Sequence, residues 1–178
     1  MAKCVLYIAV SLDGFIARPD GNLDWLTSIP APTTGADYGY SDLLSRIGTI
    51  FMGRKTYEEI IGFGVDWPYP GKDSFVVTSN QNFKIQSPDT APFTNNLNAF
   101  ITDLKKQSEK DLWLLGGGQL TTAFINEALL DEMILTIIPK IIGDGIPLFA
   151  QHPKETHWNL LSTKSFDTGV VQLTYAKA

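Results

Sequence analysis

The segment LWLLGGGQL, residues 112–120, carries the strongest structural signal in this chain. Its four apolar residues are typical of a short strand that is buried on both faces of a sheet. Three glycines follow, and an apolar stripe at helical spacing begins at Leu120 and continues through Ala123, Phe124 and Ala128. A strand that passes through a glycine turn into a helix is the repeating unit of an α/β fold.

The same alternation of short apolar runs and helical stripes extends over most of the sequence. Further strands are predicted at Val5–Val10, Thr49–Met52, Ser74–Thr78 and Met133–Ile138. Helices are predicted where apolar residues recur at three and four positions, within 40–47 and 97–104, the second of them capped by Asn95 or Asn96.

Strands that alternate with helices need crossover connections, so we expect a mainly parallel central sheet flanked by helices. The tail differs, because Val171, Leu173 and Tyr175 alternate with polar residues after the turn signal Asp167-Thr168-Gly169. This pattern predicts a C-terminal antiparallel hairpin at one edge of the sheet. No linker or repeat divides the chain, so residues 1–178 are expected to form one α/β domain.

Composition excludes several classes of function. Hydrophobic residues make up 44% of the chain and charged residues 19%, as in an ordinary folded domain. The net charge of −5 and the absence of a basic cluster argue against nucleic acid as a partner. No apolar run approaches the roughly 18 residues of a membrane span. One cysteine and two histidines form no metal-binding pattern, and a lone cysteine favours a cytoplasmic location.

The glycines Gly116, Gly117 and Gly118 permit two interpretations. They allow a ligand to approach the backbone closely, and the helix start behind them offers free N–H groups to a pyrophosphate. Alternatively, they form a tight turn in which the helix packs closely on the strand. The spacing is not the G-x-G-x-x-G of the Rossmann fingerprint.

Two other strand ends carry groups that suit phosphate. Gly53 is followed by Arg54, Lys55 and Thr56, and the planar guanidinium of arginine fits the 2′-phosphate that distinguishes NADP from NAD. A solvated basic pair beside a helix is the alternative. Hydroxyl groups of Thr78 and Ser79 follow a third strand, and ligands of open α/β sheets bind beyond such carboxyl ends.

Four motifs, taken in order, resemble the dihydrofolate reductase superfamily, and most of all the reductase domain of the riboflavin-biosynthesis protein RibD and its stand-alone relatives. The motifs are YIAVSLDGFIA (7–17), MGRKTYE (52–58), LGGGQL (115–120) and PKIIGDGIPLF (139–149). The resemblance implies a fold like that of dihydrofolate reductase and hydride transfer from NADPH. By the same resemblance, the residues that bind this cofactor would be Ala9, Ile16, Gly53, Arg54, Lys55, Thr56, Thr78, Ser79, Gly116, Gly117, Gly118, Gln119 and Leu120.

On the substrate side, the resemblance implies roles for Asp37, Thr136 and Trp25. Asp37 would bind the reduced ring or pass a proton, with a pKa raised by an apolar cleft and with Thr136 in support. Asp37 could equally cap the following helix. Trp25 would belong to a mobile active-site loop, or would be a half-buried anchor of that loop.

The resemblance implies that the substrate is a pyrimidine- or pterin-like small molecule. The riboflavin branch reduces 5-amino-6-(5-phosphoribosylamino)uracil, and dihydrofolate is the alternative. Lys72 weakens the folate alternative because it stands where dihydrofolate reductases have an arginine that binds a carboxylate. A NADP-binding module without catalysis also stays open. The riboflavin branch further implies a homodimer.

Overall fold

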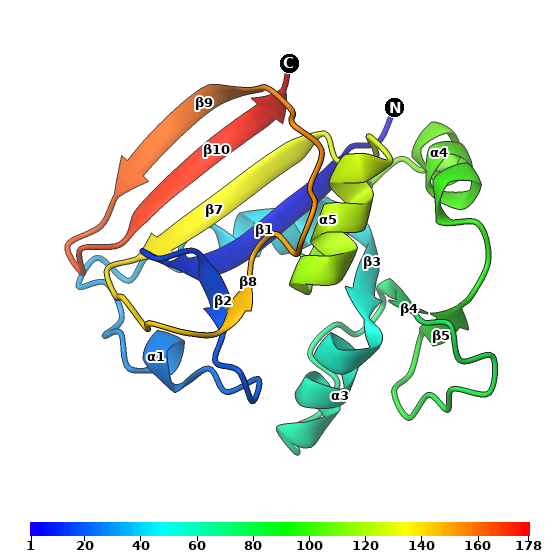
Figure 1. The fold of residues 1–178 in the computed structure, drawn as a ribbon, viewed down its shortest axis with the longest axis horizontal. Coiled ribbons are helices and arrows are strands. Elements are labelled where there is room, and N and C mark those ends of the chain that lie inside the picture. The colour runs from blue at the N-terminus through cyan, green and yellow to red at the C-terminus, as the bar shows by residue number, and fades with distance from the viewer.

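The computed structural model describes all residues 1–178, which form fifteen helices and strands (Figure 1). The strands are β1 (Cys4–Ser11), β2 (Phe15–Ala17), β3 (Ile47–Gly53), β4 (Asp73–Val77), β5 (Thr90–Phe93), β6 (Asp111–Gly116), β7 (Glu132–Ile138), β8 (Ile146–Pro147), β9 (Trp158–Ser165) and β10 (Val171–Lys177). The helices are α1 (Asp24–Thr27), α2 (Tyr40–Arg46), α3 (Arg54–Gly62), α4 (Leu97–Gln107) and α5 (Gly118–Asn126).

Eight strands form one mixed sheet in the order β5-β4-β3-β6-β1-β7-β10-β9. The pairs from β5 to β7 are all parallel, and β10 runs antiparallel to both β7 and β9. The predicted parallel sheet and the C-terminal antiparallel hairpin are therefore both confirmed. Strand β1 lies inside the sheet between β6 and β7, which explains the apolar character of its sequence.

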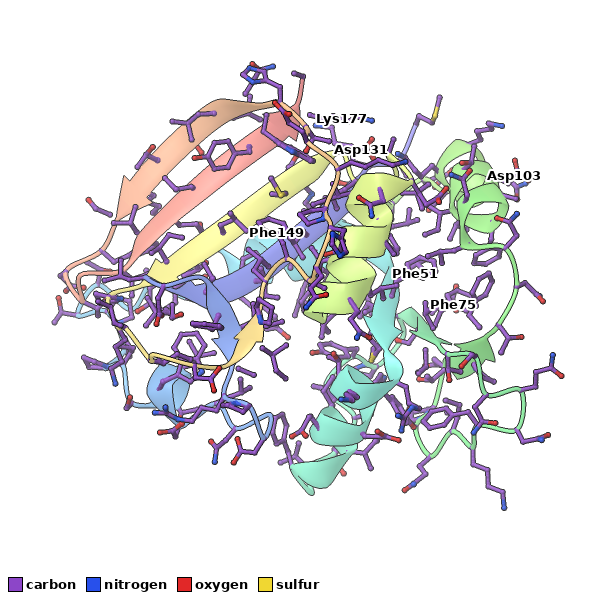
Figure 2. The ribbon with its side chains drawn as sticks, viewed as in Figure 1. Phe51, Phe75, Asp103, Asp131, Phe149 and Lys177 are labelled. Carbon is purple, nitrogen blue, oxygen red and sulfur yellow. The ribbon has the colours of Figure 1, made fainter.

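Helices cover both faces of the parallel part of the sheet. On one face α4 and α5 pack on a core cluster that includes Leu6, Phe51 and Phe124. Phe51 stacks on Phe75 in this cluster, with ring centroids 5.4 Å apart (Figure 2). On the other face α2 and α3 pack on a second cluster around Trp113. Successive residues of β1 face opposite clusters, because side chains alternate along a strand.

The antiparallel edge of the sheet has much less cover. No helix lies over β7, β10 and β9 on the side that faces the viewer in Figure 1. All residues of β9 except Trp158 are exposed, and those of β10 are mostly half-buried. Leu160 and Leu161 are 53% and 58% exposed. This edge therefore presents apolar side chains to the solvent.

The predicted helix caps and strand ends agree with the structure to within a few residues. Asn96 is the N-cap of α4, and its side chain accepts a hydrogen bond from the N–H of Ala99 at 3.2 Å. The short strands β2, β5 and β8 were not predicted from the sequence. No helix has both the length and the apolar character that are needed to cross a membrane.

Candidate cofactor and substrate site

Two helices begin side by side at the carboxyl ends of β3 and β6. The N-cap of α3 is Gly53 and that of α5 is Gly117, and neither helix start has a side-chain cap. The first N–H groups of each helix have no intrahelical partner, and the helix dipole adds partial positive charge there. The arrangement creates an electropositive cradle without lysine or arginine being required.

Glycine at these positions leaves room above the backbone. A Cβ at Gly53 would lie 3.8 Å from the carbonyl oxygen of Gly116. A Cβ at Gly117 would lie 3.4 Å from Thr56 Oγ1 and 3.8 Å from Ile16 Cδ1. The structure therefore brings Gly53, Thr56, Gly116, Gly117 and Ile16 close together at this edge of the sheet.

The three glycines of the turn have different roles. Gly116 has a φ of +120°, which residues with a side chain rarely adopt. A Cβ at Gly118 would lie only 2.1 Å from the carbonyl oxygen of Pro147 in β8. Gly118 is thus required for close packing, as the alternative interpretation proposed, whereas Gly117 faces the open cradle.

The remaining predicted cofactor residues surround this cradle in different environments. Arg54 and Lys55 are exposed at the start of α3, and Arg54 Nη1 pairs with Glu58 Oε1 at 2.7 Å. Gln119 is exposed in the first turn of α5. The side chain of Leu120 is buried in the core, so only its backbone can reach a ligand.

The hydroxyl groups beyond β4 lie one strand further along the sheet. Thr78 directly follows Val77, the last residue of β4, which pairs with Gly53 of β3. The Thr78 Oγ1 atom accepts a hydrogen bond from the N–H of Asn80 at 3.1 Å, and Ser79 is exposed. Both residues therefore lie at the same carboxyl edge as the cradle.

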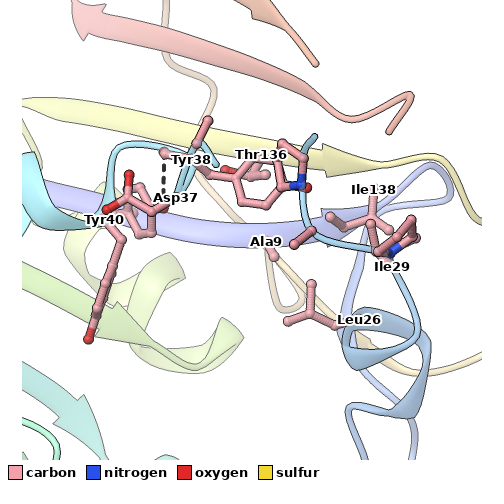
Figure 3. A pocket seen from close by; sticks show the side chains of 13 residues that line it. Ala9, Leu26, Ile29, Asp37, Tyr38, Tyr40, Thr136 and Ile138 are labelled. Atoms are coloured by element: carbon pink, nitrogen blue, oxygen red, sulfur yellow. Dashed lines mark hydrogen bonds between the residues drawn. The ribbon is translucent and has the colours of Figure 1, made fainter. Parts of the chain in front are cut away.

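A pocket of about 540 Å³ opens beside β1, which lines it with Tyr7 and Ala9 (Figure 3). Three separate parts of the chain supply its walls: β1, the segment from α1 to α2, and β7. Figure 3 shows Asp37 and Tyr40 at one end and a group of apolar side chains at the other. The lining residues are Tyr7, Ala9, Leu26, Ile29, Pro30, Ala31, Pro32, Ala36, Asp37, Tyr38, Tyr40, Thr136 and Ile138.

Asp37 lines this pocket but is exposed, and its carboxylate also binds the start of α2. Its two oxygens accept hydrogen bonds from the N–H groups of Gly39 at 3.0 Å and Ser41 at 2.8 Å. Hydrogen bonds from Ser41 are the largest influence, and they lower the pKa of Asp37 below its ordinary value. The prediction of a raised pKa in an apolar cleft is wrong, because bound N–H groups stabilise the charged form.

Thr136 lines the same pocket as Asp37 and is fixed by a polar network. The Gln172 amide on β10 donates to Thr136 Oγ1 at 2.9 Å and to the carbonyl oxygen of Tyr38 at 2.7 Å. The Tyr7 hydroxyl donates to the same carbonyl at 3.1 Å. Burial, followed by the charge of Asp37, raises the pKa of Tyr7 to about 12.

Trp25 is a fully buried loop anchor rather than a half-buried one. Its side chain is only 1% exposed and packs with Ile138 and Val170 below the pocket, and Trp25 is absent from the lining. Its indole N–H is buried without a hydrogen-bond partner. Trp25 therefore anchors the segment that carries Leu26 and Ile29 into the lining.

Lys72 does not face the pocket either. Its ammonium group donates to the carbonyl oxygens of Leu44 and Ile47, both at 2.8 Å, at the end of α2. These are carbonyls that the helix itself leaves unpaired. The structure thus places the lysine in a helix-capping role.

The cradle and the pocket both border β1, through neighbouring residues of that strand. The Cδ1 atom of Ile8 would lie 3.4 Å from a Cβ at Gly116, while its neighbour Ala9 lines the pocket. Sequence reasoning missed Tyr7, Tyr38 and Gln172, because their roles depend on contacts between distant segments. No group of three or more His, Cys, Asp or Glu side chains is arranged to bind a metal ion.

The fold is that of dihydrofolate reductase. The Enterococcus faecalis dihydrofolate reductase complexed with NADP(H) superposes with a TM-score of 0.69 at 17% identity, over 98% of this chain and 96% of the other. Residues 71–172, more than half of the chain, match the RibD C-terminal domain. The chain belongs to this family.

Two similar proteins match along nearly the whole chain. The uncharacterised Bacillus subtilis protein YwjB is 39% identical over 99% of this chain and 98% of its own length. A Shewanella crystal structure whose name links it to riboflavin biosynthesis has 32% identity and a TM-score of 0.88, with 100% and 99% coverage. The family resemblance inferred from the four motifs is confirmed.

Proposed function

We propose that this protein is an NADPH-dependent reductase of a pyrimidine- or pterin-like ring compound. The observation that carries the proposal is that a pair of helix starts with glycine N-caps and an apolar pocket both border β1. Hydride transfer requires donor and acceptor atoms in near contact, so the two binding sites must adjoin. NADPH supplies the hydride when it is bound.

The residues of the cradle fit a dinucleotide phosphate. The uncapped starts of α3 and α5 offer N–H groups for the pyrophosphate, and Thr56 adds a hydroxyl group. Arg54, whose only ion pair is with the exposed Glu58, would turn toward the 2′-phosphate. Ala9 and Ile16 would flank the nicotinamide. Gln119 and the backbone of Leu120 would line the ribose.

On the substrate side, Asp37 would act chiefly as a hydrogen-bond acceptor. Its lowered pKa keeps it ionised near neutral pH, so it can hold ring N–H groups but is a poor proton store. Thr136 would support this contact. The named activity of the riboflavin branch, reduction of 5-amino-6-(5-phosphoribosylamino)uracil, supplies the first compound to assay, and dihydrofolate supplies the second.

The cofactor proposal predicts a difference between NADPH and NADH. A ligand that binds only the folded state raises the melting temperature, so NADPH should raise it clearly more than NADH. The Arg54→Ala variant should bind NADPH roughly tenfold or more weakly and narrow that difference, because a charge-assisted contact is lost. Thermal unfolding with each nucleotide is the measurement.

Lys106→Ala is the matched control, because Lys106 forms a similar exposed ion pair with Asp103 on α4. It should leave both shifts unchanged. Equal shifts for the two nucleotides, or none, would contradict the cofactor proposal. NADPH binding without loss of NADPH absorbance in the presence of these compounds, and of their counterparts without the anionic group, would instead favour a module without catalysis.

A further inference from the structure

We propose that the pocket beside β1 accepts a planar ring compound that carries no phosphate or other anionic group. This inference rests on the proposed function and narrows its substrate class. It separates this chain from an enzyme for the phosphoribosyl form of the pyrimidine. Three features of the structure support it: the charges in the pocket lining, the occupied start of the neighbouring helix α2, and the partners of the nearby cations.

The lining carries one charge, and that charge is negative. Of the thirteen lining residues only Asp37 is ionised near neutral pH, and no lysine, arginine or histidine is among them. A phosphate monoester carries about −1.5 to −2 charges at pH 7. A phosphate in this pocket would therefore meet repulsion from Asp37 and no compensating cation.

Backbone N–H groups can also bind phosphate, but two of those at the helix start beside this pocket are already occupied. Asp37 lies just before the start of α2. The Asp37 carboxylate accepts hydrogen bonds from the N–H groups of Gly39 and Ser41. The protein's own anion thus takes the place that a ligand phosphate would need. The rest of the lining is mostly apolar.

The cations nearest in the chain are held by other groups. Arg18 Nε and Nη2 bind the two carboxylate oxygens of Asp24 at 2.6 and 3.0 Å. Lys72 caps α2, as described above. Lys140 donates to Ser28 Oγ, directly before the lining residue Ile29, and is the one cation positioned at the margin of the pocket.

The shape and surface of the pocket favour a flat, weakly polar ring. Tyrosine rings and apolar side chains form most of the walls, and such surfaces bind the faces of planar rings. The polar groups are few and lie around Asp37 and Thr136. A carboxylate beside an apolar wall selects a ring with N–H donors at one edge and no negative group elsewhere.

The test is the affinity of the protein, saturated with NADP⁺ so that nothing is reduced, for matched compounds. The pairs are 5-amino-6-(ribosylamino)uracil against its 5′-phosphate, and dihydrobiopterin against dihydrofolate, measured by calorimetry. We expect the member without the anion to bind about tenfold more tightly, because like charges a few ångströms apart repel through partly buried surroundings.

Two variants assign the discrimination to the pocket. Asp37→Asn should narrow the difference within each pair severalfold, since the amide keeps its acceptor oxygen but lacks the charge. Asp42→Asn should leave the difference in affinity unchanged, because Asp42 is exposed on α2 and does not line the pocket. Lys140→Gln should also leave it unchanged.

Equal or tighter binding of the phosphorylated compound would overturn the inference. If the Lys140→Gln variant then lost that binding, Lys140 would be identified as the phosphate-binding group. Failure of both compounds without an anion to bind would overturn it as well. NADP⁺ binding is measured in the same samples, and the titrations are repeated on the nucleotide-free protein. A failure of the cofactor proposal is thereby distinguished from a failure of this one.

Discussion

Lys72 donates both of its hydrogen bonds to carbonyl oxygens at the end of α2, where its charge also interacts favourably with the negative end of the helix dipole. A long flexible lysine can reach this position from the loop before β4. The result is a fixed connection between α2 and that loop.

This contact predicts that Lys72→Met lowers the free energy of unfolding by about 1–3 kcal/mol, since two carbonyl oxygens lose a charged donor. Urea unfolding measures the change. Lys84→Met is the control, because Lys84 is exposed. Dihydrofolate affinity should be the same in both variants. A Lys72→Met protein with wild-type stability and weaker folate binding would contradict the capping role.

For single residues, the sequence predicted the location in the fold better than the burial and hydrogen bonding of the side chain. It brought Asp37 and Thr136 to one site, but the burial and pKa predicted for Asp37 were wrong. The two N–H groups that stabilise its charge belong to a turn whose geometry is set by the positive φ of Tyr38 and Gly39. Trp25 was likewise placed in the correct segment, but its full burial depends on β7 and on Val170.

At the scale of elements, the start of α5 separates binding from packing. Gly117 and Gly118 are neighbours, yet one faces the cradle and the other contacts the backbone of β8. Ordinary φ angles at Gly117 would accept a side chain without backbone strain. The pair therefore offers a test in which each variant is the control for the other.

We expect Gly117→Ala to retain most of its stability and to lose NADPH affinity at least tenfold, because the methyl group enters the cradle. Gly118→Ala should instead lower the free energy of unfolding by about 1–3 kcal/mol, through overpacking against Pro147. Denaturant unfolding and NADPH titration of both variants check this. Wild-type NADPH binding by Gly117→Ala would exclude the cradle as the phosphate site.

The elements that the sequence predicted are those with long apolar runs or clear helical spacing. Strand β1 and helices α4 and α5 are examples. The missed strands β2, β5 and β8 have only three, four and two residues, and β5 and β8 each contain a proline. Such strands form because neighbouring backbone is already in place, so their own residues carry little signal.

At the scale of the whole molecule, the β9 edge of the sheet is left uncovered. An exposed edge strand offers unpaired backbone groups, and an exposed apolar patch favours association. Leu160 and Leu161 provide that patch. The homodimer implied by the riboflavin branch stays a prediction, and this edge is where we expect the two copies to meet.

Size-exclusion chromatography with light scattering should therefore give about twice the chain mass of 19.6 kDa. Replacing both leucines of β9 by lysine should produce a monomer, because the charges oppose burial of the edge. Phe63→Lys is the control, since Phe63 is also an exposed apolar side chain, 55% exposed at the end of α3. A wild-type monomer would contradict the prediction.

At this scale the fold class and family were readable from the order of the motifs, whereas the pocket was not. Its lining comes from residues 7–9, 26–40 and 136–138, which meet only after the sheet has formed. No local pattern within any of the three segments announces that meeting. The starts of α3 and α5 were easier to predict, since a glycine marks the end of the strand before each helix.

The central position of β1 has a consequence for biosynthesis. Its partners β6 and β7 begin at residues 111 and 132, so the first strand to leave the ribosome has no neighbour until most of the chain has been made. Closing such long loops slows folding. During that interval an apolar segment stays unpaired, and a nascent chain in this condition depends on chaperones or on fast completion of synthesis to avoid aggregation.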